Sequence, residues 1–288
     1  MTDSLAAILE TAPERVATGF ELTEGPLWDA EGGWFYFVDT RRSRLYRVTP
    51  GKEAEVVCEN PGGVNGTTFD LLGRIVICES PSRRVVRLDA DCRVDVLADR
   101  FEGKRLNRPN DVTCRSDGSI YFTDPGLRVP LAERELPYSA VYRVTPAGDV
   151  SLIADCEYPN GLAFSPDERV LYVANSRSVQ YIHAIELDAD GNMARRRIFA
   201  DMSSDSTAGV PDGIKVDVEG RVYCAGPGGV WVFAHDGTRL GIIPTAENPS
   251  NLAFGSPDLR TLFFTARTSV YALRVKSPGV AHARFRGR

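Results

Sequence analysis

The chain repeats itself at intervals of roughly 40 to 50 residues, and this period constrains the fold more than any other feature of the sequence. Each repeat opens with an acidic or amide residue, usually followed by glycine, and continues into a short apolar stretch. The six opening residues are Glu24, Asn65, Asn110, Asn160, Asp212 and Asn251. Short strands repeated at this period are typical of the blades of a β-propeller.

Each repeat follows the plan of a four-stranded blade. A turn follows the opening, and a second strand rich in β-branched and aromatic residues comes next, expected at residues 34–38, 75–78, 120–123, 170–174, 222–225 and 262–265. A third strand alternates apolar and polar residues, as at 44–48 and 140–144. A fourth strand precedes the next opening.

The sixth repeat lacks a fourth strand, and a spare segment at residues 14–19 lies just before Glu24. We therefore expect an all-β chain in which the N-terminal strand completes the last blade and closes the ring, leaving no free sheet edge. The prediction is one six-bladed β-propeller domain over residues 1–288, with its core at about 14–276 and short terminal tails.

Composition narrows the partners and the location. A formal net charge of −5 argues against nucleic acid as the main partner, and the basic end at residues 284–288 reads as a solvated tail. No apolar run reaches the roughly 20 residues that span a bilayer, so no membrane partner is expected. The first fifteen residues do not resemble a signal peptide, which indicates a cytoplasmic protein. Six cysteines without CxxC spacing are expected to be reduced core residues. The oligomeric state is not indicated.

The opening residues begin the innermost strands, so they are expected to surround the central channel on one face. Three long loops, at residues 100–109, 125–139 and 201–211, should reach the same face. For any single Asn-Gly or Asp-Gly pair a turn is the simpler explanation, because these residues tolerate positive φ. Glu24 is a poor turn former, however, and Asp212 interrupts the Asn series.

Two carboxylates and several amide oxygens directed at one axis suit a hard cation, since calcium takes six to eight oxygen ligands. Zinc held by histidines is disfavoured, because the chain has three histidines and none of them is at an opening. The sequence also lacks a nucleophile elbow, a Walker loop, an HExxH motif and a dinucleotide fingerprint.

The stretches 106–112 and 116–125 carry a family resemblance. With the openings, they make the chain resemble the senescence-marker-protein (regucalcin)/gluconolactonase family of metal-dependent six-bladed propellers, and most of all its bacterial gluconolactonases. The resemblance covers about residues 14–275. One departure is Ser80, because many bacterial members carry a histidine at this position after a Cys-Glu pair.

The resemblance implies the site. The family's metal ligands match Glu24, Asn110, Asn160 and Asp212, and an arginine that holds substrate hydroxyls in the animal lactonases matches Arg108. It implies a divalent cation, calcium by chemical default, with manganese, zinc or iron(II) as alternatives. Whether Asn65, Glu79 or Asn251 contributes to the site stays open.

The implied activity is metal-dependent opening of a sugar lactone, such as gluconolactone, to the sugar acid. The metal would polarise the carbonyl, and Asp212 is our choice of general base. The alternatives are a phosphotriesterase-like or other ester hydrolase, a strictosidine-synthase-like propeller and a non-catalytic metal-binding propeller.

Polar residues also end the second strands on the face of the openings. Asp39, Glu79, Asp124 and Asn175 either line the pocket or satisfy turn amides, and we include Asp124 as a substrate contact. Tyr138, in the longest loop of this class, either stacks on a sugar ring or is a solvated loop aromatic, and it is included as well.

Overall fold

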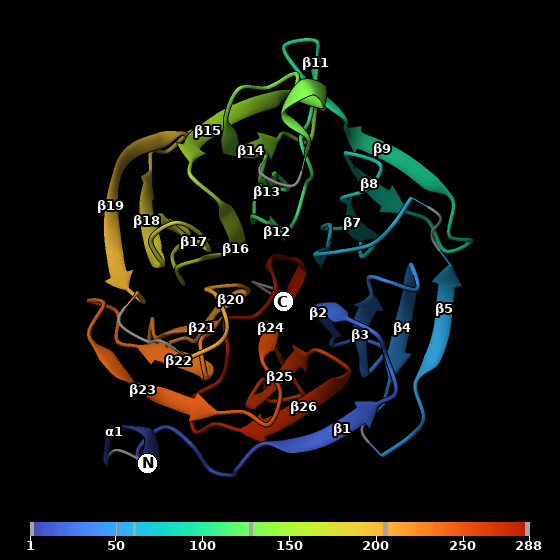
Figure 1. The fold of residues 1–288 in the computed structure, drawn as a ribbon. Coiled ribbons are helices and arrows are strands. Elements are labelled where there is room, and N and C mark those ends of the chain that lie inside the picture. Colours follow the sequence, from blue (N-terminus) through green and yellow to red (C-terminus); the bar gives the residue numbers. More distant parts are fainter. Residues whose placement is uncertain (1–2, 50, 60–61, 127–128, 204–206, 286–288) are drawn as a thin grey trace.

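The computed structural model describes residues 3–49, 51–59, 62–126, 129–203 and 207–285. Six four-stranded antiparallel sheets surround a central axis, with the first strand of each sheet innermost (Figure 1). This arrangement confirms the predicted six-bladed propeller. Within the described residues, no helix is long and apolar enough to cross a membrane.

The first three blades use consecutive strands. Blade 1 consists of β2 (Thr23–Asp29), β3 (Trp34–Asp39), β4 (Arg44–Val48) and β5 (Glu55–Glu59). Blade 2 consists of β6 (Thr67–Phe69), β7 (Ile75–Glu79), β8 (Arg84–Leu88) and β9 (Val94–Ala98). Blade 3 consists of β12 (Val112–Cys114), β13 (Ile120–Asp124), β14 (Ser139–Val144) and β15 (Val150–Cys156). A small hairpin of β10 (Arg100–Phe101) and β11 (Lys104–Arg105) precedes blade 3, and a 3-10 turn, η1 (Leu131–Glu133), lies between β13 and β14.

The next two blades repeat this plan. Blade 4 consists of β16 (Pro159–Phe164), β17 (Val170–Asn175), β18 (Tyr181–Leu187) and β19 (Met193–Asp201). Blade 5 consists of β20 (Ile214–Val216), β21 (Val222–Gly226), β22 (Gly229–Phe233) and β23 (Arg239–Pro244). A four-residue helix, α1 (Asp3–Ala6), packs against β23.

Blade 6 combines both ends of the chain. It consists of β24 (Pro249–Gly255), β25 (Thr261–Ala266), β26 (Ser269–Arg274) and, as its rim strand, β1 (Glu14–Thr18). β1 runs antiparallel to β26, with Glu14 opposite Ala272 and Thr18 opposite Ser269. Residues before blade 1 and after blade 5 therefore share one sheet.

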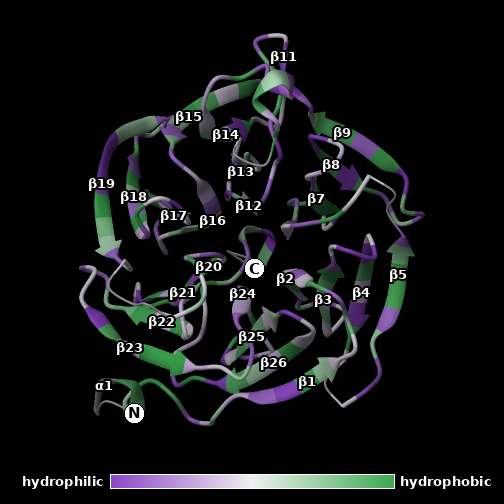
Figure 2. Cartoon of the chain, viewed as in Figure 1, coloured by the Kyte–Doolittle hydropathy of each residue, from purple (hydrophilic) through white to green (hydrophobic). Residues whose placement is uncertain are grey.

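Burial explains the sequence pattern of the strands. Inner strands such as β16 and β24 are buried along their whole length because neighbouring blades cover both of their faces. Rim strands such as β9 and β19 are largely exposed and mix hydrophobic with hydrophilic residues (Figure 2). Aromatic rings fill the spaces between blades. The ring centroids of Phe35 in blade 1 and Phe263 in blade 6 lie 4.5 Å apart, which joins the first blade to the last.

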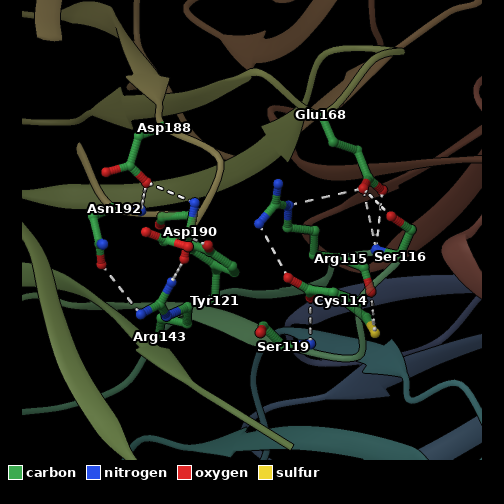
Figure 3. Close-up of polar contacts among 12 residues, drawn as sticks. Cys114, Arg115, Ser116, Ser119, Tyr121, Arg143, Glu168, Asp188, Asp190 and Asn192 are labelled. Carbon is green, nitrogen blue, oxygen red and sulfur yellow. Dashed lines mark hydrogen bonds and ion pairs between the residues drawn. The ribbon is translucent and has the colours of Figure 1, made fainter. Parts of the chain in front are cut away.

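Polar contacts also join neighbouring blades, as between blades 3 and 4 (Figure 3). The hydroxyl of Tyr121 donates to the carbonyl of Gly191 at 2.8 Å, and the guanidinium of Arg143 donates to Asn192 Oδ1 at 3.2 Å. Glu168 accepts from the backbone N–H of Ser116 at 3.2 Å. These bonds involve the turns opposite the strand openings, so blade 3 is fixed to blade 4 on that face.

The six cysteines are free, as predicted, and Cys58, Cys78, Cys114 and Cys224 are buried. The prediction of a solvated C-terminal tail, in contrast, is wrong for Arg284 and Phe285. Residues 286–288 of that predicted tail lie outside the described part of the chain. The side chain of Arg284 is 14% exposed and pairs with Glu31. Phe285 follows a segment that crosses one mouth of the channel, where Val280 N–H donates to the carbonyl of Val216 at 3.0 Å. A 3-10 turn, η2 (Ala283–Phe285), ends this segment.

Candidate active site

The inner strands begin at a cavity of about 500 Å³ on the channel axis. Five opening residues, each from a different blade, line it: Glu24, Asn65, Asn110, Asn160 and Asp212. Arg108 lines the same cavity, so the structure brings together the predicted ligands and the predicted substrate-binding arginine. The opposite ends of these strands surround a second, mainly apolar cavity of about 310 Å³, closed by the C-terminal segment.

Glycines at the openings allow adjacent inner strands to approach closely. A Cβ added to Gly161 would lie 2.2 Å from the carbonyl oxygen of Asp212, and one added to Gly66 would lie 2.8 Å from the carbonyl oxygen of Asn110. Neither glycine has positive φ. The turn explanation therefore does not account for these two Asn-Gly pairs. Here the glycine lets the start of one inner strand pack directly against the start of the next.

The sixth opening residue, Asn251, lies beneath the cavity rather than on its wall. It is 3% exposed, and its Nδ2 donates to Glu24 Oε2 at 3.1 Å and to Asp111 Oδ2 at 3.3 Å. Asn251 thus holds two carboxyl groups from blades 1 and 3 next to each other.

The charges around Glu24 are strongly perturbed. Burial, followed by the charge of Asp111, raises the pKa of Glu24 to about 7, although hydrogen bonds from Gly25 N–H and Asn251 act in the opposite direction. Burial also raises the pKa of Asp111 and lowers that of Lys215, whose charge faces both carboxylates. The fold therefore buries two carboxyl groups and one amine together, and burial disfavours the charged form of each.

Asn160 presents an unpaired oxygen. The side chain is 5% exposed, and its Nδ2 donates to Ser176 Oγ at 2.9 Å. Its Oδ1 is buried and accepts no hydrogen bond from the described residues. An unpaired buried acceptor costs about 1–3 kcal/mol, so this atom calls for a partner that the described residues do not supply.

The structure places Asp124 and Tyr138 away from the cavity wall. Asp124 is fully buried, and its Oδ2 accepts from the backbone N–H of Asn107 at 2.8 Å. Burial raises the pKa of Asp124 to about 7. Tyr138 packs against the hydrophobic cluster shared by blades 2 and 3, and its carbonyl accepts from Asn107 Nδ2 at 2.9 Å. Both residues thus support the segment that carries Arg108 instead of facing the cavity.

Residues at the ends of other second strands also accept hydrogen bonds from nearby backbone N–H groups. This favours the interpretation that these residues satisfy turn amides over the one that they line the pocket. Asp39 accepts from the backbone of Glu21 at 2.9 Å, and Asn175 Oδ1 accepts from the backbone of Tyr158 at 2.8 Å. In both cases the end of a second strand holds the residues that lead into the inner strand of its own blade. Glu79 lies against Gly62, which leads into the inner strand of blade 2, and also contacts Arg84.

Two of the three long loops contribute to the wall. Arg108 comes from residues 100–109, and Ala208, Gly209 and Val210 come from residues 201–211, of which 204–206 lie outside the described part. No described residue of the 125–139 loop lines the cavity, and residues 127–128 of that loop are not described.

Of the serines that follow two second strands, only Ser80 stood out in the sequence, as a departure from the family pattern. Ser176 and the buried charges of Asp111 and Lys215 did not. Ser80 lines the cavity, and Ser176 bonds to Asn160. The available signal was weak: a polar pair, Glu-Ser in blade 2 and Asn-Ser in blade 4, ends the second strand in alternate blades.

Residues 22–268 match the family described as the SMP-30/Gluconolactonase/LRE-like region. The chain belongs to this family. Among relatives of this SMP-30/gluconolactonase chain, a gluconolactonase from Zymomonas mobilis is 33% identical over 96% of this chain and 85% of the relative. A pentonolactonase from Haloferax volcanii is 29% identical over 88% and 84% of the two chains. The solved structure of a gluconolactonase from Xanthomonas campestris is 36% identical, covers 96% of this chain and 93% of that one, and has a TM-score of 0.87.

These findings confirm the resemblance to the SMP-30/gluconolactonase family. The described residues contain no cluster of three or more His, Cys, Asp or Glu side chains suited to a metal ion. The predicted ligand set is of another kind, since two of its four members are amides.

Proposed function

We propose that this chain is a lactonase that hydrolyses a sugar lactone, of the aldonolactone class that includes gluconolactone, to the sugar acid. The names of the relatives from Zymomonas mobilis, Haloferax volcanii and Xanthomonas campestris support lactone hydrolysis. The observation that carries the proposal is the convergence of Glu24, Asn110, Asn160, Asp212 and Arg108 on one cavity.

A divalent cation, calcium by preference, fits the oxygen donors of Glu24, Asn110, Asn160 and Asp212. The unpaired Oδ1 of Asn160 is a ready acceptor, and the raised pKa of Glu24 indicates a carboxylate whose charge is under-compensated. Two carboxylates would balance the charge of such an ion. When bound, the ion would polarise the lactone carbonyl and stabilise negative charge on its oxygen.

The chain's own residues supply the rest of the reaction. The cavity of about 500 Å³ lies within the usual range for small-molecule sites. Arg108 orients the substrate by donating to its hydroxyl oxygens. Asp212 accepts a proton from water as the water oxygen bonds to the carbonyl carbon. The ring C–O bond then breaks, and the ring oxygen takes up a proton to become a hydroxyl of the sugar acid.

The backbone keeps Asp212 in place for this role. Its N–H donates to the carbonyl of Ala225 at 2.9 Å, which fixes the start of β20 against β21. The test is the variant Asp212→Ala, assayed for acid release from gluconolactone. We expect lactone opening to be abolished with the fold intact, whereas Asp190→Ala, at an exposed turn, keeps full activity. Full activity in Asp212→Ala would refute its role as base.

A panel of aldonolactones of varied stereochemistry and ring size, together with a phosphotriester, tests the substrate class. Lactone opening without phosphotriester cleavage is the expected result. Cleavage of the phosphotriester alone would replace the lactonase assignment with the phosphotriesterase-like alternative.

A further inference from the structure

Two serines occupy equivalent positions in blades 2 and 4. Ser176 follows β17 and accepts from Asn160 Nδ2 at 2.9 Å, and its hydroxyl donates to the carbonyl of Pro211 at 2.6 Å. Ser80 follows β7, accepts from Asn65 Nδ2 at 3.3 Å and donates to the carbonyl of Pro109. Each serine thus bonds to the opening asparagine of its own blade and to the proline that precedes the opening of the next blade.

The chemistry of these groups fixes the direction of every bond. The proline carbonyl can only accept, so it takes the single proton of the serine hydroxyl. The hydroxyl then has only lone pairs left for the asparagine, and the asparagine must turn its Nδ2 toward the serine. As a result, Oδ1 of Asn160 points away from Ser176, and it is the buried oxygen that accepts no hydrogen bond from the described residues.

We propose that Ser176, which is 3% exposed, is a positioning residue for cation binding. It holds the amide of Asn160 so that Oδ1, and not Nδ2, faces the cation, and it ties this amide to the carbonyl next to Asp212. The inference rests on the proposed function, in which Asn160 and Asp212 are ligands. Without the hydroxyl, the amide is free to rotate by half a turn and present its N–H groups to a positive charge.

The test is calorimetric titration of Ca²⁺ into chelator-treated protein. Residues that orient metal ligands typically contribute about 10- to 100-fold to affinity, and we expect Ser176→Ala to weaken Ca²⁺ binding by this amount. Ser80→Ala is the matched control. It likewise frees a carbonyl that precedes a predicted ligand, Asn110, but the amide that it releases is that of Asn65, which is outside the predicted ligand set. Its Ca²⁺ affinity is expected to stay within about threefold of the parent.

A double-mutant cycle separates the loss of amide orientation at Asn160 from a general loss of rigidity around the cation site. Aspartate at position 160 offers an oxygen in either orientation, so Ser176→Ala should cost less than about threefold in the Asn160→Asp background. If Ser176→Ala does not fold, Ser176→Cys keeps a similar volume with a weak donor and is expected to weaken binding in the same direction.

Three results would overturn the inference. Parent-like Ca²⁺ affinity in Ser176→Ala, with binding lost in Asn160→Ala, would refute the role of Ser176 and leave the proposed cation site intact. An equal loss in Ser80→Ala would show that the effect is not specific to Asn160. Parent-like affinity in Asn160→Ala would overturn both this inference and the proposed ligand set.

Discussion

The variant Glu24→Gln tests whether the fold buries a carboxylate that only a cation can balance. Burial and the neighbouring charge of Asp111 raise the pKa of Glu24 from 4.5 to about 7. This rise corresponds to about 3 kcal/mol of preference for the protonated form. A glutamine removes the charge but keeps an oxygen that can accept from Gly25 N–H and Asn251, so the local hydrogen bonds can be retained.

The sign of the effect follows from linkage. A group whose pKa is raised in the folded state contributes stability that is present below about pH 4.5 and is lost as the pH rises through about 7. Chelator-treated parent protein should therefore lose up to about 3 kcal/mol of stability from this group between pH 4.5 and pH 8. Glu24→Gln does not titrate and escapes this loss, and Asp111 and Lys215 remain in both proteins.

The assay is differential scanning calorimetry at pH 5 and pH 8 in excess chelator. At pH 8 we expect the melting temperature of Glu24→Gln to exceed that of the parent by roughly 5 to 10 °C, with a much smaller difference at pH 5. Added Ca²⁺ should raise the melting temperature of the parent and not that of the variant. Glu53→Gln, at an exposed position, is the matched control and should behave as the parent. A Glu24→Gln protein that is less stable than the parent at pH 8, or a difference that is the same at both pH values, would refute this reasoning.

Three further variants test packing and substrate contacts. Phe35→Ala removes the ring that stacks on Phe263 between blades 1 and 6, and chemical unfolding should show a loss of about 3–5 kcal/mol; a loss below about 1 kcal/mol would contradict the role of this contact in joining the first and last blades. Gly161→Ala places a Cβ against the Asp212 carbonyl and is expected to lower kcat/KM for lactone by about 100-fold. The control Gly126→Ala, whose added Cβ has its nearest contact at 3.4 Å, should be tolerated. Equal activity in the two variants would be inconsistent with close strand approach at the openings. Arg108→Ala should raise KM by about 10- to 100-fold, the equivalent of about 1.5–3 kcal/mol, in steady-state assays, and an unchanged KM would exclude a substrate contact.

The blade plan was predictable because it repeats. A residue type that recurs before each inner strand fixes both the number of blades and the face of the disc on which those residues lie. For this reason Glu24 and Asp212 could be assigned to one cavity although they are 188 positions apart in the sequence.

The direction of individual side chains was not predictable from that pattern. Asn251 shares its repeat position with Asn160, yet it bonds to Glu24 and Asp111 beneath the cavity. Asp124 ends its strand on the expected face, but it satisfies the backbone N–H of Asn107. Which side-chain oxygen stays without a hydrogen bond depends on partners that other blades supply. The sequence of a single repeat does not contain this information.

The C-terminal segment shows a different limit. Its charges suggested a solvated tail, but the ends of the inner strands leave an apolar mouth to the channel, where Phe285 contributes to the wall. Arg284 forms an ion pair with Glu31 and keeps a small part of its side chain exposed to solvent. Its guanidinium lies over the rings of Phe69 and Phe285. The apolar surface that recruits this segment exists only once the ring is closed.

Lactone opening measured before and after removal of divalent cations tests the central claim most directly. Gluconolactone hydrolysis, followed by acid release at constant pH, should be lost in excess chelator and restored when Ca²⁺ is returned, with the propeller still folded by circular dichroism. Activity that is unchanged in excess chelator would contradict a lactonase that depends on a cation held by Glu24, Asn110, Asn160 and Asp212.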